Sequence, residues 1–178
     1  MIHTVRYNSP VGSIVLAERD GGLIGLWIEG QKYYFGSIQD EITEKETPIL
    51  AQSMAWLDRY FAGEKPEIHE LKLFPIGGTF RRQVWEILCE IAYGETTTYG
   101  KIAKKMAVKM GKKSMSAQAV GGAVGHNQIS IIIPCHRVVG ANGSLTGYAG
   151  GIATKVKLLT HEGVNMDRLF TPQKGTAL

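Results

Sequence analysis

The spacing of apolar residues changes from a strand-like to a helical pattern near residue 76. Before this point, residues 2–7, 12–17 and 23–28 are rich in strand-forming residues, and Asp20-Gly21-Gly22 is typical of a hairpin turn. After it, apolar residues recur every three or four positions. These patterns predict an α+β protein in which a small antiparallel sheet precedes a helical part.

The first part also contains one predicted helix and one predicted loop. Thr47-Pro48 offers an N-cap followed by proline at the first helical position, and apolar residues then follow at helical spacing until Gly63. Residues 31–46 are polar, acidic and aperiodic, so we expect a loop there. Nothing in this first part indicates a catalytic site.

The second part is predicted to be all-helical. Thr79 is the expected cap of a helix through residue 91, a second helix covers 99–106, and Ser114-Met115-Ser116 caps a third over 117–124. A basic connection from Lys104 to Lys113 joins the last two. Helix, glycine-containing turn and short helix form the helix-turn-helix pattern. Cys89 lies inside the first helix, where a buried structural thiol is expected.

Length and composition limit the classes of protein that this chain can be. A chain of 178 residues with 44% hydrophobic and 20% charged residues has the balance of a globular protein and excludes a disordered one. We expect three segments: residues 1–76, residues 77–165 and a tail at 166–178. No apolar run is long enough to span a membrane, and no export signal opens the chain, so we expect a cytoplasmic monomer.

Charge is distributed unevenly along the chain. Residues 1–79 contain 7 Lys/Arg and 11 Asp/Glu, whereas residues 80–178 contain 13 and 5, so net charges of −4 and +8 make up the overall +4. A strongly basic half indicates a polyanionic partner, and nucleic acid is the commonest one. Chance clustering on a solvated surface is the alternative.

One short segment carries the residues of a reactive thiol. The apolar run Ile131-Ile132-Ile133 reads as a buried strand that stops at Pro134, and Cys135, His136 and Arg137 follow. A cysteine attacks as its thiolate, and a histidine oriented by a carboxylate can activate it. His161-Glu162 offers a second partner. A core cysteine beside a surface histidine, a helix-turn-helix regulator and a thiol hydrolase remain alternatives.

The residue pattern indicates no cofactor and no metal. The two cysteines are far apart and the five histidines show no ligand spacing. The glycine-rich stretches at 121–125 and 147–151 lack the lysine or the strand–helix context of nucleotide-binding loops.

Residues 79–163 as a whole resemble the O6-alkylguanine-DNA alkyltransferases, also called methylated-DNA–protein-cysteine methyltransferases. The Pro-Cys-His-Arg-Val core is close to diagnostic of that family. The other matching segments are Phe80-Arg81-Arg82-Gln83-Val84-Trp85, Gly94-Glu95-Thr96-Thr97-Thr98-Tyr99, Asn127, Gly147-Tyr148-Ala149-Gly150-Gly151 and Leu158-Leu159-Thr160-His161-Glu162-Gly163. The resemblance implies a ribonuclease H-like first domain and a winged-helix-like second domain that repairs double-stranded DNA carrying O6-alkylguanine and O4-alkylthymine.

The resemblance also implies roles for individual residues. Cys135 accepts the alkyl group once, because the thioether product cannot be hydrolysed. His136 acts through a water, together with Glu162, to keep Cys135 as a thiolate. Tyr99 forms a hydrogen bond to guanine. Asn127 fixes the turn after the recognition helix. Val138, Tyr148 and Ala149 form the base pocket. The expected DNA-binding residues are Thr98, Gly100, Lys112, Lys113, Ser114, Gln118, Ala119, Gly121, Gly122 and Arg137, and the resemblance implies binding from the minor groove.

Two features depart from the family pattern. Gln118 stands where the family usually has an arginine that fills the space left by the flipped base. A glutamine can fill that space but adds no charge. The connection from Lys104 to Ser116 is also longer and more basic than usual, and we expect its lysines to supply the missing attraction to phosphate. Proteins that share this fold but lack the acceptor cysteine only sense DNA damage, and the presence of Cys135 argues against that class.

Overall fold

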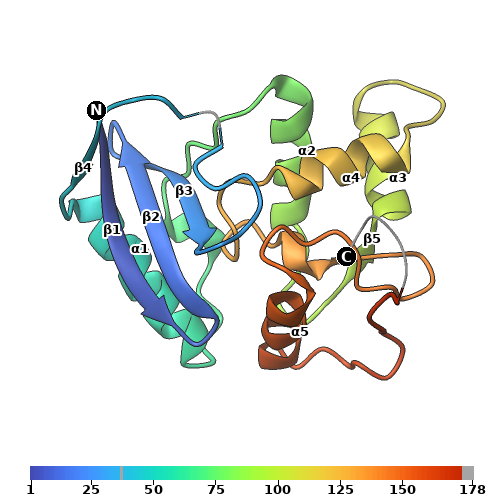
Figure 1. The fold of residues 1–178 in the computed structure, drawn as a ribbon. Helices are drawn as coiled ribbons and strands as arrows, with labels where there is room; N and C mark the ends of the chain where they lie inside the picture. The colour runs from blue at the N-terminus through green and yellow to red at the C-terminus, as the bar shows by residue number, and fades with distance from the viewer. Residues whose placement is uncertain (37, 174–178) are drawn as a thin grey trace.

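The computed structural model describes residues 1–36 and 38–173 of the chain. Two parts lie side by side in Figure 1: a sheet with a helix packed on it, and a group of helices. We call residues 1–76 the N-terminal half and the described residues from 77 onward the C-terminal half. The α+β class predicted from the sequence is confirmed.

The N-terminal half is built on a four-stranded sheet in the order β3-β2-β1-β4. Antiparallel hairpins join the first three strands, and Asp20 and Gly21 both have positive φ, as the predicted hairpin turn requires. The strands are β1 (Ile2–Ser9), β2 (Gly12–Arg19), β3 (Gly22–Ile28) and β4 (Ile42–Glu44).

Strand β4 corrects the prediction of a continuous loop over residues 31–46. It pairs in parallel with β1, through Ile2 and Ile42 among others, so the sheet is mixed rather than purely antiparallel. All three β4 residues are exposed, and they show no apolar alternation. The strand depends on backbone pairing with the free edge of β1, which local residue patterns do not reveal.

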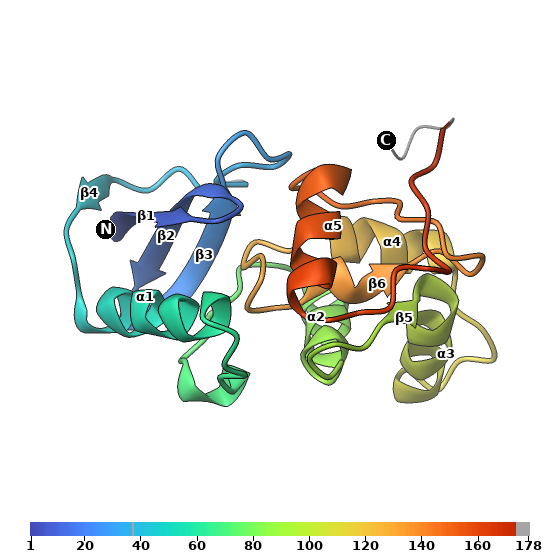
Figure 2. The same cartoon turned by 90° about the horizontal axis from the view of Figure 1, so that it is seen from below.

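Helix α1 (Pro48–Phe61) packs across one face of this sheet (Figure 2). Pro48 takes the first helical position as predicted, but the Thr47 hydroxyl makes no capping hydrogen bond. A short 3-10 helix, η1 (Ile68–Glu70), leads toward the second half.

The C-terminal half contains helices α2 (Thr79–Cys89), α3 (Tyr99–Lys109), α4 (Ala117–Gly125) and α5 (Ile152–His161). Gly78 rather than Thr79 is the N-cap of α2. The hydroxyl groups of Thr98 and Ser116 cap α3 and α4 by accepting backbone N–H bonds. Helix α3 runs three residues beyond its predicted end, so most of the expected basic connection is helical.

Two short strands make the C-terminal half more than a helical domain. β5 (Thr97–Thr98) pairs in parallel with β6 (Val138–Val139), which corrects the all-helical prediction. The 3-10 helix η2 (Cys135–Arg137) leads directly into β6. The pair therefore holds the start of α3 next to the segment that carries Cys135.

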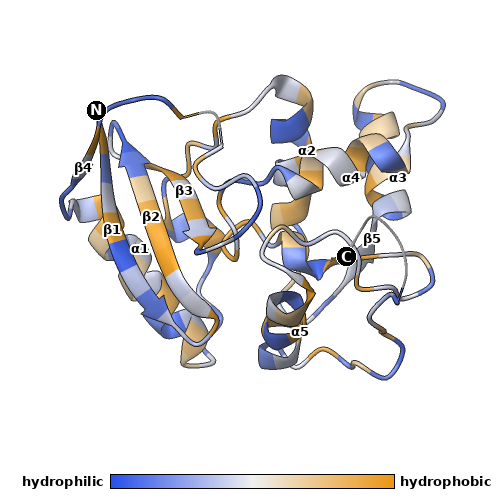
Figure 3. Cartoon of the chain, viewed as in Figure 1, coloured by the Kyte–Doolittle hydropathy of each residue, from blue (hydrophilic) through white to orange (hydrophobic). Residues whose placement is uncertain are grey.

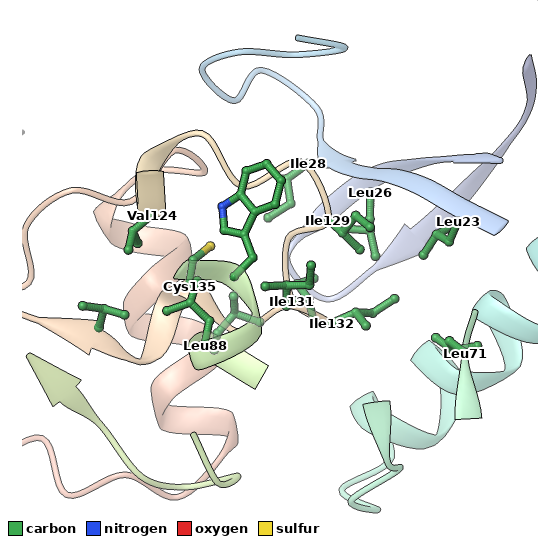
Figure 4. Close-up of a cluster of buried hydrophobic side chains, with 14 of the residues drawn as sticks. Leu23, Leu26, Ile28, Leu71, Leu88, Val124, Ile129, Ile131, Ile132 and Cys135 are labelled. Atoms are coloured by element: carbon green, nitrogen blue, oxygen red, sulfur yellow. The ribbon is translucent and has the colours of Figure 1, made fainter. Parts of the chain in front are cut away.

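A single hydrophobic cluster runs through both halves. Figure 4 shows Cys135 beside Val124 and Leu88 at one end of it, and Leu23 and Leu71 at the other. In Figure 3 hydrophobic residues are prominent on β2 and β3, and hydrophilic residues mark the linker after α3. Residue 76 is therefore not a break in the packing.

The expected tail is partly integrated into the fold. Met166 and Leu169 pack against a smaller cluster with Val139, Leu145 and Leu159, and Phe170 forms an isolated bridge with Ser144. Residues 174–178 of the tail lie outside the described residues. Within the described residues, no helix is long and apolar enough to cross a membrane.

Candidate active site

The segment before Cys135 is buried as predicted, but it is not a strand. Residues 131–133 form turns, and Ile131 has a φ of 70°, a left-handed conformation that β-branched residues rarely adopt. The Asn127 side chain forms hydrogen bonds with backbone groups that a neighbouring strand would otherwise pair. Its Nδ2 donates to the Ile133 carbonyl at 2.8 Å, and its Oδ1 accepts from the Ile129 N–H at 3.1 Å. Asn127 thus bridges the turn between α4 and η2.

The same amide contacts the Cys135 thiol. Asn127 Nδ2 donates to Cys135 Sγ at 3.1 Å, and Cys135 is 5% exposed. Burial raises the pKa of this thiol, whereas the Asn127 hydrogen bond and the nearby Lys155 ammonium act to lower it. The thiol is therefore held in an apolar setting with two groups that favour the thiolate.

His136 and Glu162 form a buried pair next to Cys135. His136 Nε2 lies 2.7 Å from Glu162 Oε1, and both side chains are fully buried. Burial lowers the pKa of His136, so the ring is neutral near pH 7. Because a carboxylate only accepts, we assign the hydrogen to Nε2, which leaves Nδ1 as the basic nitrogen. Nδ1 is buried and has no hydrogen-bond partner among the described residues.

Arg137 belongs to this buried network, which corrects its predicted role in DNA contact. Its Nε and NH2 groups each donate to Glu162 at 2.9 Å, and NH1 donates to the Ile91 carbonyl at 2.6 Å. Burial alone would raise the pKa of Glu162, but the hydrogen bonds from His136 and Arg137 hold it well below its usual range. At 6% exposure, Arg137 neutralises a buried carboxylate rather than meeting solvent.

Sequence reasoning missed Tyr60, which joins the network from the N-terminal half. The Tyr60 hydroxyl donates to Glu162 Oε1 at 2.8 Å from helix α1. In the sequence Tyr60 reads only as one more apolar position of that helix. Its partner lies 102 residues away, so no local pattern predicts the contact.

Sequence reasoning also missed Lys155, a fully buried lysine of α5. Its ammonium donates to the carbonyls of Val138 and Thr146. Burial lowers the pKa of Lys155 to about 8, and the charge of the Cys135 thiolate opposes this shift. The sequence does contain an indication that Lys155 is buried. Lys155 lies three residues after Ile152 and three before Leu158, so helical spacing places it on the core-facing side of the helix.

An open pocket of about 390 Å³ lies beside this site. Seven of its lining residues are glycines, and a Cβ added to Gly122 or Gly125 would meet nothing within 4 Å. The predicted pocket residues Tyr148 and Ala149 line it, together with Gly121 and Gly122 of the predicted DNA-contact set. Such walls leave room for a flat, rigid group to enter between α4 and the loop 146–151.

Tyr99 and Val138 already have partners in this structure. Tyr99 Oη donates to the Thr146 carbonyl at 2.9 Å, and burial raises its pKa to about 12. A Cβ on Gly147 would lie 2.7 Å from that oxygen, so only glycine fits between Tyr99 and the pocket loop. The carbonyl of Val138, a predicted residue of the base pocket, accepts a hydrogen bond from the Lys155 ammonium.

The other predicted DNA contacts gather around α3, α4 and the linker between them. Except for the half-buried Thr98 and Gly121, they are exposed: Gly100, Lys112, Lys113, Ser114, Gln118, Ala119 and Gly122. Lys105 pairs with Glu90, the C-cap of α2, and Lys109 pairs with Glu86 of α2, so they are not the free charges that the sequence suggested. The described residues contain no cluster of three or more His, Cys, Asp or Glu side chains that could hold a metal ion.

Both halves of the chain match known protein families. Residues 79–164 match the family described as 6-O-methylguanine DNA methyltransferase, DNA binding domain. Residues 2–75 match 6-O-methylguanine DNA methyltransferase, ribonuclease-like domain.

Named relatives and solved structures agree with these matches. A methylated-DNA–protein-cysteine methyltransferase of Methanosarcina acetivorans is 42% identical over 88% of this chain and 96% of its own length. One from Mycolicibacterium paratuberculosis is 41% identical over 91% and 93%. The Mycobacterium tuberculosis O6-methylguanine methyltransferase crystal structure superposes with a TM-score of 0.76, at 38% identity and 98% and 97% coverage. Mycobacterium tuberculosis OGT in complex with DNA gives 0.75, at 39% identity and 90% and 91% coverage. On these similarities, this chain belongs to the 6-O-methylguanine DNA methyltransferase family.

Proposed function

We propose that this protein repairs DNA by moving the alkyl group of O6-alkylguanine, and of O4-alkylthymine, onto Cys135. The observation that carries the proposal is the position of the thiol. Cys135 is buried close to Tyr148, a wall residue of an open, glycine-lined pocket, and a neutral histidine with a free basic nitrogen follows it directly. A family resemblance over both halves supports the same reaction.

The chemical step is a displacement at carbon. The Cys135 proton passes to His136 Nδ1, directly or through a water, and the sulfur attacks the alkyl carbon. An S–C bond forms while the bond between the alkyl carbon and the base oxygen breaks, and the electron pair stays with the base. The base then takes up one proton, for which the Tyr99 hydroxyl beside Gly147 of the pocket loop is a candidate donor. The proton that His136 took from Cys135 returns to Tyr99 through solvent, so no net proton is gained or lost.

The surrounding groups lower the cost of forming the thiolate. Asn127 donates to the sulfur, and the buried Lys155 ammonium supplies a positive charge. Glu162 keeps His136 in the tautomer that leaves Nδ1 free. The product is a thioether, and no residue of the site can hydrolyse a thioether. Each protein molecule therefore acts once.

DNA is proposed to bind across α3, the linker and α4 as a helix-turn-helix. The small residues of α4 suit the narrow minor groove, which is about 6 Å wide. Gln118 fills the gap that the flipped base leaves, and flipping costs least for an unstable pair, which favours lesions.

The finer architecture belongs to the same proposal. The N-terminal half is ribonuclease H-like and the C-terminal half is winged-helix-like, with segments at 1–76, 77–165 and 166–178. The protein works as a cytoplasmic monomer without a cofactor.

Intact mass measurement after incubation with an O6-methylguanine duplex tests the function. We expect a gain of about 14 Da per molecule, mapped to Cys135 and absent from Cys135→Ser, because only the activated thiol attacks. Cys89 is the internal control, since burial raises its pKa to about 11. Methyl groups on Cys89, or several turnovers per molecule, would contradict the proposal.

A further inference from the structure

The loop after β3 extends from the N-terminal half toward the C-terminal half (Figure 1). Gly30, Lys32 and Tyr33 line the pocket together with α4 and the loop 146–151. The Lys32 N–H donates to the Ala149 carbonyl at 3.1 Å, and the Tyr33 ring stacks on His126 at 4.1 Å between centroids. The loop therefore contacts both of the other pocket walls.

The backbone of this loop is strained at two residues and is held by aromatic contacts. Tyr33 and Phe35 have φ values of 58° and 59°, in the left-handed region that residues other than glycine, asparagine and aspartate seldom enter. The Phe35 ring stacks on Trp27 of β3 at 4.6 Å, and Tyr33 stacks on His126. Backbone strain of this kind persists only where surrounding contacts hold it, and it is concentrated at functional sites.

The loop places one exposed cation, Lys32, at the pocket of a half whose net charge is negative. Residues 1–79 carry a net charge of −4, yet Lys32 is exposed at the pocket and forms no ion pair within the described part of the chain. The nearest acid in sequence, Glu29, lies 3.9 Å from Arg6 instead. Tyr33 is 53% exposed. His126 Nδ1 donates to the Gly122 carbonyl at 2.7 Å, which fixes the ring on which Tyr33 stacks.

We propose that Lys32, with Tyr33, binds a backbone phosphate of the nucleotide that enters the pocket. The inference rests on the proposed function. The uncharged base suits the glycine-lined interior of the pocket, while its sugar and phosphates stay at the entrance. At the entrance lie the Lys32 ammonium and the exposed Tyr33, whose hydroxyl can donate a hydrogen bond to phosphate and whose ring stacks on His126. The N-terminal half thus takes a direct part in binding DNA.

Small substrates distinguish binding at this phosphate site from general electrostatic attraction between the protein and DNA. The rate constant for methylation of Cys135 is measured with free O6-methylguanine and with the 3′- and 5′-monophosphates of O6-methyldeoxyguanosine. In the wild type we expect at least one phosphate to raise the rate constant severalfold over free base. Lys32→Ala should remove that advantage. Lys45→Ala, an exposed lysine of the same half that lines no described pocket, should keep it.

Duplex DNA provides the second measurement. One lost phosphate contact lowers the slope of log affinity against log salt by about 0.9, a loss of up to about eightfold in affinity at 0.1 M salt. We expect this change for Lys32→Ala and not for Lys45→Ala. If the wild type methylates Cys135 but both variants behave alike in both assays, the phosphate site is refuted and the proposed function stands. If the wild type transfers no methyl group at all, the proposed function itself fails.

Discussion

Replacing Glu162 with glutamine tests the buried network most directly. Glu162 accepts two hydrogen bonds from Arg137, one from His136 and one from Tyr60, with no exposed side-chain surface. Glutamine keeps the shape but removes the charge, and its NH2 group must face a donor. Arg137 then becomes a buried cation without a counter-ion.

The expected loss of stability is large. Removing one partner of a buried ion pair typically costs about 3–5 kcal/mol. A domain of ordinary stability has about 5–15 kcal/mol, so the variant should remain folded at 25 °C with a much reduced margin. Methyl transfer should slow by about a hundredfold or more, because His136 loses the group that orients it as a base.

The pH dependence of unfolding identifies the cause. Glu162 has a depressed pKa in the folded state, so its stabilising contribution is present above the unfolded pKa of about 4.3 and is lost as pH falls through the folded value. Below about pH 4.3 the wild type should therefore lose up to about 1.4 kcal/mol per pH unit from this group, which the variant lacks. The gap between wild type and Glu162→Gln should narrow as pH falls.

Urea unfolding at several pH values measures this gap, and Glu95→Gln, at an exposed site of the same half, is the matched control. Parallel stability curves for wild type and Glu162→Gln, or a loss below about 1 kcal/mol at pH 7, would refute the reasoning.

Three further predictions concern the thiol and the DNA surface. Lys155→Met should raise the pKa of the Cys135 thiol and therefore slow methyl transfer near pH 7, by about tenfold if the pKa rises by about 1. Lys157→Met, at an exposed position of the same helix, should change neither the pKa nor the rate. Thiolate absorbance measures the pKa. Gln118→Ala should slow repair in duplex DNA more than reaction with free alkylguanine, and equal slowing of both would show that Gln118 is structural. Lys112→Ala with Lys113→Ala should reduce the salt slope of duplex binding by up to about 2, with no change if these lysines miss the backbone.

Local patterns predicted most of the secondary structure. Alternation and the hairpin at Asp20-Gly21 located three strands, and the capping segment that ends at Ser116 marked the start of α4. These features succeed because a turn or a cap is formed by residues close together in the chain.

The secondary-structure predictions that were wrong share one cause. Strand β4 exists through pairing with β1, and the short β5–β6 pair joins residues about forty positions apart. The apolar run at Ile131 looked like a strand, but the Asn127 side chain satisfies its backbone groups and holds it in turns. Each outcome depends on a partner that is distant in sequence or on a side-chain bond that propensity does not encode.

The sequence by itself determined which residue is the candidate acceptor. Cys135, His136 and Glu162 are readable because a thiol, a base and a carboxylate stand in a characteristic motif, and side-chain chemistry is a property of the residue. Only the tertiary structure decided what surrounds them. Folding turned Arg137 inward onto Glu162, brought Tyr60 to it from another helix and buried Lys155 near the thiol. Burial, charge pairing and the pKa values that follow from them arise only when distant segments pack together.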